Sequence, residues 1–378
     1  MDQNNHGLAQ IITKPCSILN EHGDMPPPFK DLKCQTLIAV NIMIFIFCSE
    51  KNADADRVFS ELENMGRDAI VLDSSNELVD IRINFDNATP TARLTTKDFS
   101  FSTEEISAIW FKGGELNLDK WRGRWDKKVS EEYAYFLESE LGAVEFSILN
   151  ILSSLPSLGN EVGSRINRLS SLHAAKTFGI KVPKTLITTR TKDIIEAKNK
   201  SKIGKYIQDA FPIRVNGKTS IPSITRVEDL KLGPSPSVFP IALMDYIEQK
   251  RDVRTFILDN KFYTVTIKTT KLNKPLSSKE IKGADIVIEK YDLPSELKMK
   301  TVAFLNSLKL NTASVDFVEK DGVFYLIDVN PIGEFSTISD AVNFELPNKI
   351  AHYLCRLSSK HLAPLNMSQC LLCPKSRH

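Results

Sequence analysis

Short apolar runs and amphipathic stretches alternate along the first part of the chain. The run "MIFIFCSE" (43–50) is mostly apolar, "ADRVFSELENMG" (55–66) places apolar residues at helical spacing before Gly66, and "DAIVLD" (68–73) is apolar again. This order predicts a buried strand, an amphipathic helix and a second buried strand, which together open an α/β domain. The run at 36–48 has the length of a signal-peptide core, but its β-branched and aromatic residues favour the strand.

The same patterns predict the remaining elements. An alternating run at 78–85 and an apolar run at 105–116 complete a small α/β unit over 43–116. A long amphipathic helix is expected at 130–155, broken near Gly142 or Ser153. Further helices are expected at 166–180, at 191–200, after Pro294 and at 343–360, strands at 181–189, 202–207, 212–221 and 239–247, and hairpins at 254–269 (turn Asp259-Asn260) and 312–330 (turn 320–322).

Length and composition limit the class of protein. A chain of 378 residues suits two or three subdomains around a sizeable core. The net charge of +2, from 49 basic and 47 acidic residues, argues against bulk capture of nucleic acid or of a membrane surface. No apolar run is long enough to cross a bilayer. Six scattered cysteines fit a reducing cytoplasm, and we interpret the Cys370 and Cys373 pair as idle thiols.

Polar side chains interrupt the apolar strands of the last predicted hairpin. Asp316 and Asp328 fall opposite each other if the turn is centred near Gly322, and Asn330 points to the same face as Asp328. Scattered aspartates more often mark an exposed polar face. Both strands look buried, however, and carboxylates that lose solvation need a cation between them. The sequence therefore predicts a Mg2+ site completed by phosphate oxygens.

Two weaker signals concern phosphate binding. Asp252 and Arg254 share a strand face in "DYIEQKRDVRTF" (245–256). They form either a plain salt bridge or a site in which the guanidinium meets phosphate and the carboxylate meets a ribose hydroxyl. Lys205 in "KIGKYI" is a solvated charge or, if it faces inward, a phosphate ligand.

In this order, these residues resemble the ATP-grasp superfamily, and more narrowly the graspetide (microviridin-type) peptide maturases of the grasp-with-spasm type. The resemblance covers about 43–360. It is carried by "IWFKGG" (109–114), by "NRLSSLHAAKTFGIKVPKTLITT" (167–189), by "DYIEQKRDVRTFILDNKFYTVTI" (245–267) and by the run 310–354 that contains the last hairpin.

The resemblance implies an α/β (α+β) ATP-grasp fold, in which an N-terminal α/β domain precedes central and C-terminal subdomains that clamp ATP. We expect these three parts at 43–160, 161–245 and 246–362, between a poorly ordered extension at 1–42 and a tail at 363–378. The resemblance implies that Tyr246 and Ile247, with Asp245 nearby, bind adenine and that Asp252 binds the ribose. It implies that Lys205 and Arg254 bind phosphates and act in catalysis, and that Asp316, Asp328 and Asn330 bind Mg2+. Trp110 and Lys112 would contact the substrate peptide.

The implied reaction is an ATP-dependent macrocyclisation in the cytoplasm, by an enzyme that is expected to dimerise. Its partner is a ribosomally made precursor peptide with a leader and a core. A side-chain carboxylate of the peptide is activated as an acyl phosphate, and a Ser/Thr hydroxyl or a Lys amine then displaces phosphate to close an ester or amide ring.

The chain departs from the family pattern at a few positions. Asp328 stands where Glu is usual, Arg168 where Lys is usual, and Lys112-Gly113 replaces an Arg pair, while 268–290 lacks the family's motifs after the hairpin. Two alternatives therefore stay open. One is an ATP-grasp carboxylate–amine ligase that acts on a small molecule or a protein tail. The other is a catalytically degenerate protein that binds a nucleotide or a peptide.

Overall fold

The computed structural model describes most of the chain from Ile42 onward. The expected extension at 1–42, apart from Ile42, the end of the tail and most of the segment 268–290 lie outside the described residues. The described residues are 42–86, 88–122, 129–161, 166, 168–198, 202–205, 213–215, 218–220, 225–227, 232–247, 251–269 and 286–370.

A parallel four-stranded sheet comes first. β1 (Met43–Cys48) lies between β2 (Ala69–Leu72) and β6 (Ile106–Lys112), and β7 (Ser157–Leu158) pairs with the other edge of β6. β1 and β6 are buried along almost their whole length, which explains why neither shows a polar alternation. α1 (Ala53–Asn64) connects β1 to β2, so the predicted strand–helix–strand opening is confirmed.

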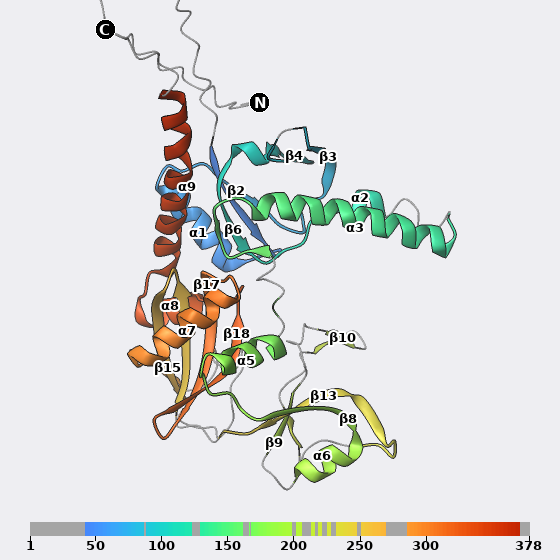
Figure 1. Cartoon of the computed structure of the whole chain (residues 1–378), viewed down its shortest axis with the longest axis vertical. Coiled ribbons are helices and arrows are strands. Elements are labelled where there is room, and N and C mark those ends of the chain that lie inside the picture. The colour runs from blue at the N-terminus through green and yellow to red at the C-terminus, as the bar shows by residue number, and fades with distance from the viewer. Residues whose placement is uncertain are drawn as a thin grey trace, which may run out of the picture. The chain divides into compact units, whose positions relative to one another are not determined.

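Helices pack against this sheet. α9 (Leu346–Cys370) contacts α1, β1 and β6, and Figure 1 shows α9 beside α1. α3 (Glu131–Ser153) runs through Gly142 and ends at Ser153, the second of the two positions at which the sequence predicted a break. A Gly in a helix interior costs only about 1 kcal/mol relative to Ala, which the remaining turns outweigh. Smaller elements follow the same region: β3 (Leu78–Asn84), β4 (Thr91–Thr96) and β5 (Ser100–Ser102) form an antiparallel sheet, with η2 (Thr103–Glu105) and α2 (Asp119–Arg122).

An antiparallel sheet of four strands follows in sequence, in the order β12-β9-β13-β8. The long β13 (Ser237–Asp245) pairs with β8 (Thr185–Arg190) on one side and with β9 (Lys202–Lys205) on the other. The helix predicted around 166–180 is confirmed and is followed by Gly179 at φ +72°. The remaining elements are α5 (Arg168–Thr177), α6 (Thr191–Lys198), β12 (Thr225–Arg226) and the hairpin of β10 (Ile213–Val215) and β11 (Lys218–Ser220).

An antiparallel five-stranded sheet forms the last part, in the order β16-β15-β14-β17-β18. Both predicted hairpin turns are confirmed. Asp259-Asn260 has φ of 49° and 63°, and Asp321-Gly322 has φ of 51° and 76°, as two-residue turns between twisted strands require. The elements are β14 (Arg251–Leu258), β15 (Lys261–Thr269), β16 (Ile286–Lys290), β17 (Thr312–Lys320), β18 (Val323–Asn330), α7 (Ser295–Ser307) and α8 (Ser336–Val342).

One hydrophobic core is shared by the parallel sheet and the five-stranded sheet. It contains Ile46 and Trp110 from the parallel sheet, Phe256 from β14, and Phe335 just before α8. The Phe335 ring lies 6.4 Å from the Trp110 ring and 5.1 Å from the Phe256 ring, centroid to centroid. This core brings the end of β6 to the segment that follows β18.

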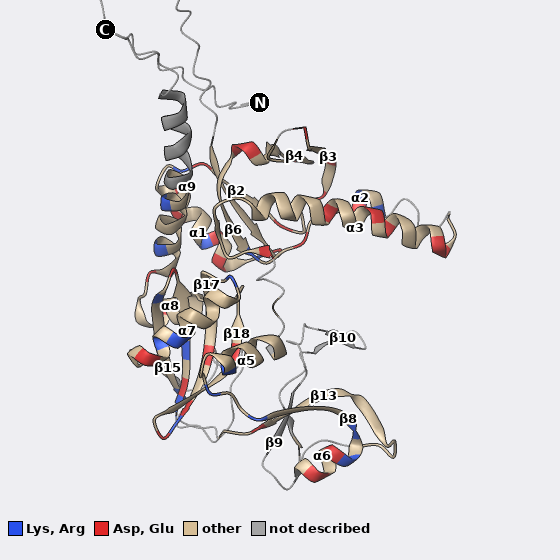
Figure 2. Ribbon diagram, viewed as in Figure 1, with Lys and Arg blue, Asp and Glu red and all other residues tan. Residues whose placement is uncertain are grey.

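Charge and hydropathy along the described elements are ordinary. No described helix is long and apolar enough to cross a membrane. Figure 2 shows acidic residues and no basic ones on α3, whereas the five-stranded sheet carries both signs.

Candidate active site

Two carboxylates lie opposite each other on the β17–β18 hairpin. Asp316 and Asp328 are direct cross-strand partners, as the sequence predicted from a turn near Gly322. The register shifts by one residue immediately after Asp316, where a bulge interrupts the ladder. Both residues are half-buried. Side chains of directly paired residues point to the same face of a sheet, so the two carboxylates share one face.

Asn330 extends this set by one position. It lies two residues beyond Asp328, on the same face, and is the cross-strand partner of Ser314. Its Oδ1 accepts a hydrogen bond from the backbone N–H of Ile332, 3.1 Å away, which leaves a second lone pair on that oxygen. Ser314 Oγ is buried without a hydrogen-bond partner among the described residues. Sequence reasoning missed Ser314, because a serine on a strand carries no local signal.

A guanidinium stands beside the carboxylates. Arg254 on β14 is the cross-strand partner of Asp316, and its Nε lies 3.8 Å from Asp316 Oδ1. The two side chains are 23% and 37% exposed, so solvent screens the pair only in part. Asp252 shares the face of Arg254, two residues earlier on the strand. Arg254, Asp316 and Asp328 thus form a row across three adjacent strands.

The donor set fits a hard divalent cation whose coordination is completed by a ligand. No group of three or more His, Cys, Asp or Glu side chains in the described residues is placed to hold a metal. The predicted set has two carboxylates and one amide oxygen, too few for a closed protein cage. Mg2+ is commonly bound by one or two carboxylates together with waters and substrate phosphates. The residues present therefore match Mg2+ in the presence of a phosphorylated ligand.

The other predicted nucleotide residues lie on the second antiparallel sheet. Asp245 ends β13, is half-buried, and donates its backbone N–H to Lys184 O at 2.9 Å. Tyr246 and Ile247 continue from it and are half-buried. Lys205 ends β9 opposite Ala242, and its side chain lies outside the described part. The structure brings Arg254, Asp316 and Asp328 together, while Lys205 and Asp245 belong to a different sheet.

Trp110 and Lys112 have a different environment from the one predicted. Their side chains are 2% and 3% exposed, so neither lies on a surface where a peptide could dock. Lys112 Nζ lies 3.0 Å from Asp54 Oδ2, 3.1 Å from Ile332 O and 2.6 Å from Gly333 O. These three acceptors use all three N–H groups of the ammonium. We therefore correct the substrate-peptide assignment: both residues are internal.

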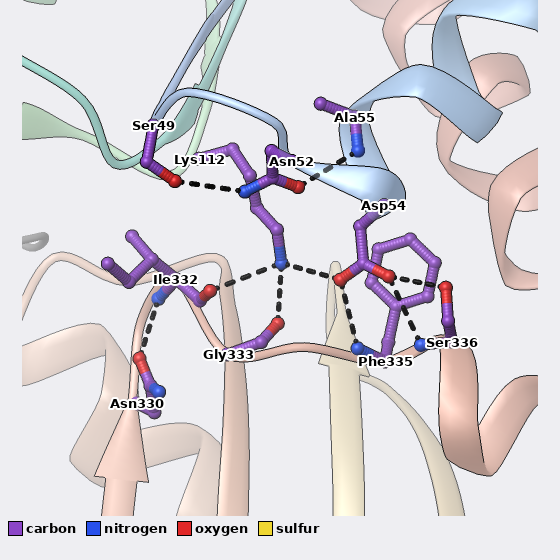
Figure 3. Close-up of polar contacts among 10 residues, drawn as sticks. All are labelled: Ser49, Asn52, Asp54, Ala55, Lys112, Asn330, Ile332, Gly333, Phe335 and Ser336. Carbon is purple, nitrogen blue, oxygen red and sulfur yellow. Dashed lines mark hydrogen bonds and ion pairs between the residues drawn. The ribbon is translucent and has the colours of Figure 1, made fainter. Parts of the chain in front are cut away.

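Asp54 is the second residue that sequence reasoning missed. Its carboxylate accepts hydrogen bonds from the backbone N–H groups of Phe335 and Ser336, at 3.1 and 3.2 Å, and from Ser336 Oγ (Figure 3). An aspartate in the first turn of a helix usually meets water and the helix dipole. Here the α1 carboxylate instead caps the first turn of α8, a helix without a side-chain cap of its own.

Ser336 and Ser339, which follow the stretch "PIGEF" (331–335), stabilise local structure. Ser336 donates to Asp54, and Ser339 Oγ accepts from the backbone N–H of Leu346 at 3.1 Å, at the start of α9. The bond from Leu346 N to Ser339 Oγ fits the capping role that polar residues take at helix ends. The "CLLC" pair falls largely outside the description: the side chain of Cys370 and the whole of Cys373 are not in the described part.

No protein-family model matches the sequence, and no curated protein matches it. Solved structures do match. The chain is similar to the macrocyclase MdnC of Microcystis aeruginosa MRC, solved with the precursor peptide MdnA, at 16% identity and a TM-score of 0.62, over 83% of this chain and 100% of that one. It is similar to a Chryseobacterium gregarium RiPP-associated ATP-grasp ligase, solved with ADP and a leader and core peptide, at 17% identity and a TM-score of 0.67, over 83% and 97%. It is also similar to the ATP-grasp ligase PsnB, solved with a minimal precursor, Mg and ADP, at 13% identity and a TM-score of 0.60, over 84% and 98%.

The chain has the ATP-grasp fold. The fold class predicted from the sequence is thereby confirmed. In this ATP-grasp fold, the five-stranded sheet carries the row of Arg254, Asp316 and Asp328, and the β12-β9-β13-β8 sheet carries Lys205 and Asp245.

Proposed function

We propose that the protein is an ATP-dependent peptide maturase. It activates Asp or Glu side chains of a ribosomally made precursor peptide as acyl phosphates and closes macrocyclic ester or amide links. The observation that carries the proposal is the row of Arg254, Asp316 and Asp328 on three paired strands of an ATP-grasp fold. The likeness to ATP-grasp ligases solved with leader, core or precursor peptides supports a peptide as the substrate.

In this proposal, Asp316, Asp328 and Asn330 hold Mg2+. The ion, when bound, neutralises charge on the phosphate chain of ATP. Arg254 orients and neutralises phosphate oxygens from the neighbouring strand, and Lys205 does so from β9. Asp245, Tyr246 and Ile247 hold the adenine, and Asp252 accepts a hydrogen bond from a ribose hydroxyl. Arg254, Asp252, the residues at 245–247 and the proposed metal ligands are half-buried, which keeps water partly out and strengthens each electrostatic contact.

The reaction balances without a protein nucleophile. A carboxylate oxygen of the peptide attacks the γ-phosphorus, and ADP leaves with the electron pair of the broken P–O bond. A hydroxyl or amine of the same peptide then attacks the acyl carbon, loses its proton and expels phosphate. Phosphoryl transfer of this kind depends on positioning and charge neutralisation, which are the functions that the named residues can supply.

Three further expectations belong to this proposal. The parts at 43–160, 161–245 and 246–362 act as an N-terminal domain and the two halves of the nucleotide clamp. The enzyme works as a homodimer. It is cytoplasmic, in keeping with its sparse and scattered cysteines.

The test measures ADP release and peptide mass in the same reactions. The protein is co-expressed with a short Thr/Glu- or Lys/Asp-rich peptide encoded beside its gene, and the peptide is searched for the loss of one water per ring. We expect Asp328→Ala and Arg254→Ala each to lower ADP release by about 100-fold or more, because each removes charge stabilisation at the phosphates. Lys320→Ala, an exposed cation on the same strand as Asp316, is the matched control and should keep wild-type turnover.

The outcomes separate the alternatives. Wild-type turnover in either site variant would remove the site assignment. Turnover that depends on a small carboxylic acid and an amine, with no change in peptide mass, would favour the carboxylate–amine ligase. Nucleotide binding without turnover under any of these conditions would favour the degenerate binding protein.

A further inference from the structure

A buried ion pair joins the end of β6 to the segment that follows the proposed metal ligand Asn330. The segment 331–336 leads from β18 into the first turn of α8, and Figure 3 shows Lys112 and Asp54 on the same side of it, with Lys112 at Ile332 and Gly333 and Asp54 at Phe335 and Ser336. Lys112 binds its carbonyls at positions 332 and 333, and Asp54 binds its N–H groups at positions 335 and 336. The pair therefore fixes both the carbonyl and the N–H side of a single turn.

The turn is also fixed at its Asn330 end. Asn330 Oδ1 accepts from Ile332 N at 3.1 Å, and Asn330 O accepts from Gly333 N at 3.2 Å. Because Lys112 binds the carbonyls of these same two residues, a shift of the ammonium changes the atoms that orient the Asn330 amide. The path from Lys112 to the Asn330 side chain contains one residue and two hydrogen bonds.

The two glycines after Lys112 lie where the backbone passes close to other parts of the chain. A Cβ at Gly113 would lie 3.1 Å from Ile332 Cδ1, which is tighter than most real contacts. Gly114 has φ +110°, and a Cβ there would lie 2.4 Å from Cys48 O. A glycine at position 113 therefore lets the strand end approach the 331–336 segment, while Gly114 lets the chain pass close to the backbone of β1.

Water does not reach the Lys112–Asp54 pair, so each charge depends on the other for its stabilisation. Both side chains are 3% exposed, and the Lys112 ammonium lies 5.1 Å from the centre of the Phe335 ring. Burial lowers the pKa of Lys112 from its usual value, and the Asp54 carboxylate opposes that shift. If one partner is removed, the other charge stays buried without compensation.

We propose that Lys112 and Asp54 are positioning residues: through the 331–336 segment they set the orientation of Asn330 and thereby the Mg2+ affinity of the site. This inference rests on the proposed function, because it takes Asn330 as a metal ligand. Groups that orient a metal ligand typically change metal affinity by 10- to 100-fold when they are removed. A pair that served only to stabilise the fold would change the melting temperature without such an effect on Mg2+.

The experiment measures binding of a fluorescent ADP analogue, with EDTA and across a Mg2+ titration, together with thermal unfolding. Lys112→Met leaves the Asp54 carboxylate buried and unpaired, so it lowers the melting temperature and can prevent folding. The double variant Asp54→Asn/Lys112→Met removes both charges and should recover stability, yet it does not restore the bonds from the ammonium to positions 332 and 333. We expect this double variant to need about tenfold or more Mg2+ for half-maximal binding, with unchanged affinity in EDTA.

Arg57→Ala is the matched control. The Arg57–Asp340 pair also joins α1 to α8, at 2.8 Å, but both side chains are exposed, and both hydrogen bonds of the Arg57 guanidinium go to Asp340. This variant should keep the wild-type Mg2+ dependence. A double variant with wild-type Mg2+ dependence would overturn the inference while the proposed function stands. A wild-type protein that does not bind the analogue with Mg2+ would overturn the proposed function and this inference with it.

Discussion

Replacing Gly333 by alanine measures how closely the segment after Asn330 packs against β17. A Cβ at position 333 would lie 2.4 Å from Ser314 Cβ and 2.5 Å from Ser314 Oγ. An ordinary contact between carbon atoms is about 3.5 to 4.0 Å, so one side must move by about 1 Å. Neither side moves easily. Ser314 is paired with β14 and β18, and the segment is bound by Lys112 and Asp54.

The expected cost follows from this geometry. Overpacking a well-filled region typically costs about 1–3 kcal/mol, and a clash with Ser314 Cβ, which the paired strand holds in place, puts Gly333→Ala in the upper half of that range. At about 2–4 °C per kcal/mol, the melting temperature falls by several degrees. The assay is thermal unfolding followed by circular dichroism. Removing the opposing side chain should relieve the clash. The double variant Ser314→Gly/Gly333→Ala should therefore melt at a higher temperature than Gly333→Ala, although a glycine in a strand costs about 0.5–1 kcal/mol.

Gly142→Ala is the control for the glycine change itself. A Cβ at Gly142 would meet nothing within 4 Å, and the residue lies inside α3. This variant should gain about 0.4–1 kcal/mol, because alanine restricts the unfolded chain and fits a helix. If Gly333→Ala melts at the wild-type temperature, or if the Ser314→Gly change fails to relieve it, the close approach inferred at position 333 is refuted.

Two further predictions concern buried side chains elsewhere. Burial raises the pKa of the Cys48 thiol to about 12, so on the order of one molecule in 10,000 carries the thiolate at pH 8. When native protein is treated with iodoacetamide, peptide mass maps should therefore show alkylated Cys355 well before alkylated Cys48. Early modification of Cys48 would contradict this. Arg251→Met removes the guanidinium whose Nε lies 3.0 Å from the Glu319 carboxylate, which is 4% exposed, so it should cost about 1–3 kcal/mol in unfolding free energy. Arg57→Ala, which breaks an exposed ion pair, should cost about 0–1 kcal/mol in unfolding free energy. A smaller cost for Arg251→Met than for Arg57→Ala would show that Glu319 does not depend on Arg251.

Much of the fold follows from local sequence chemistry. The turns at Asp259-Asn260 and Asp321-Gly322 use residues that tolerate positive φ, which fixes the register of the strands around them. Counted from the turn at Asp321-Gly322, that register alone would place Asp316 opposite Ile327, and the bulge after Asp316 shifts the pairing by one residue so that Asp328 lies opposite. The hairpin and its turn were therefore predictable from a stretch of about fifteen residues, whereas the bulge that sets the pairing of Asp316 was not.

The environments of Lys112 and Asp54 were not predictable in this way. Lys112 and Gly333 are 221 residues apart, and Phe335 lies 281 residues from Asp54. An aspartate in a first helical turn and a lysine at a strand end are both normally solvated, so neither pattern indicates burial. Their burial depends on how the parallel sheet packs on the five-stranded sheet, which no local spacing specifies.

The stretches "IWFKGG" (109–114) and "PIGEF" (331–335) form the two sides of one contact, although they lie far apart in the sequence. Lys112 supplies donors for backbone carbonyls of the second stretch, and Gly113 packs against Ile332. A cation is needed there to bind carbonyl oxygens in a dry interior beside Asp54, and a peptide partner is not required to explain it. A residue that motif matching assigns to the substrate thus acts inside the protein, one segment away from the proposed metal ligands.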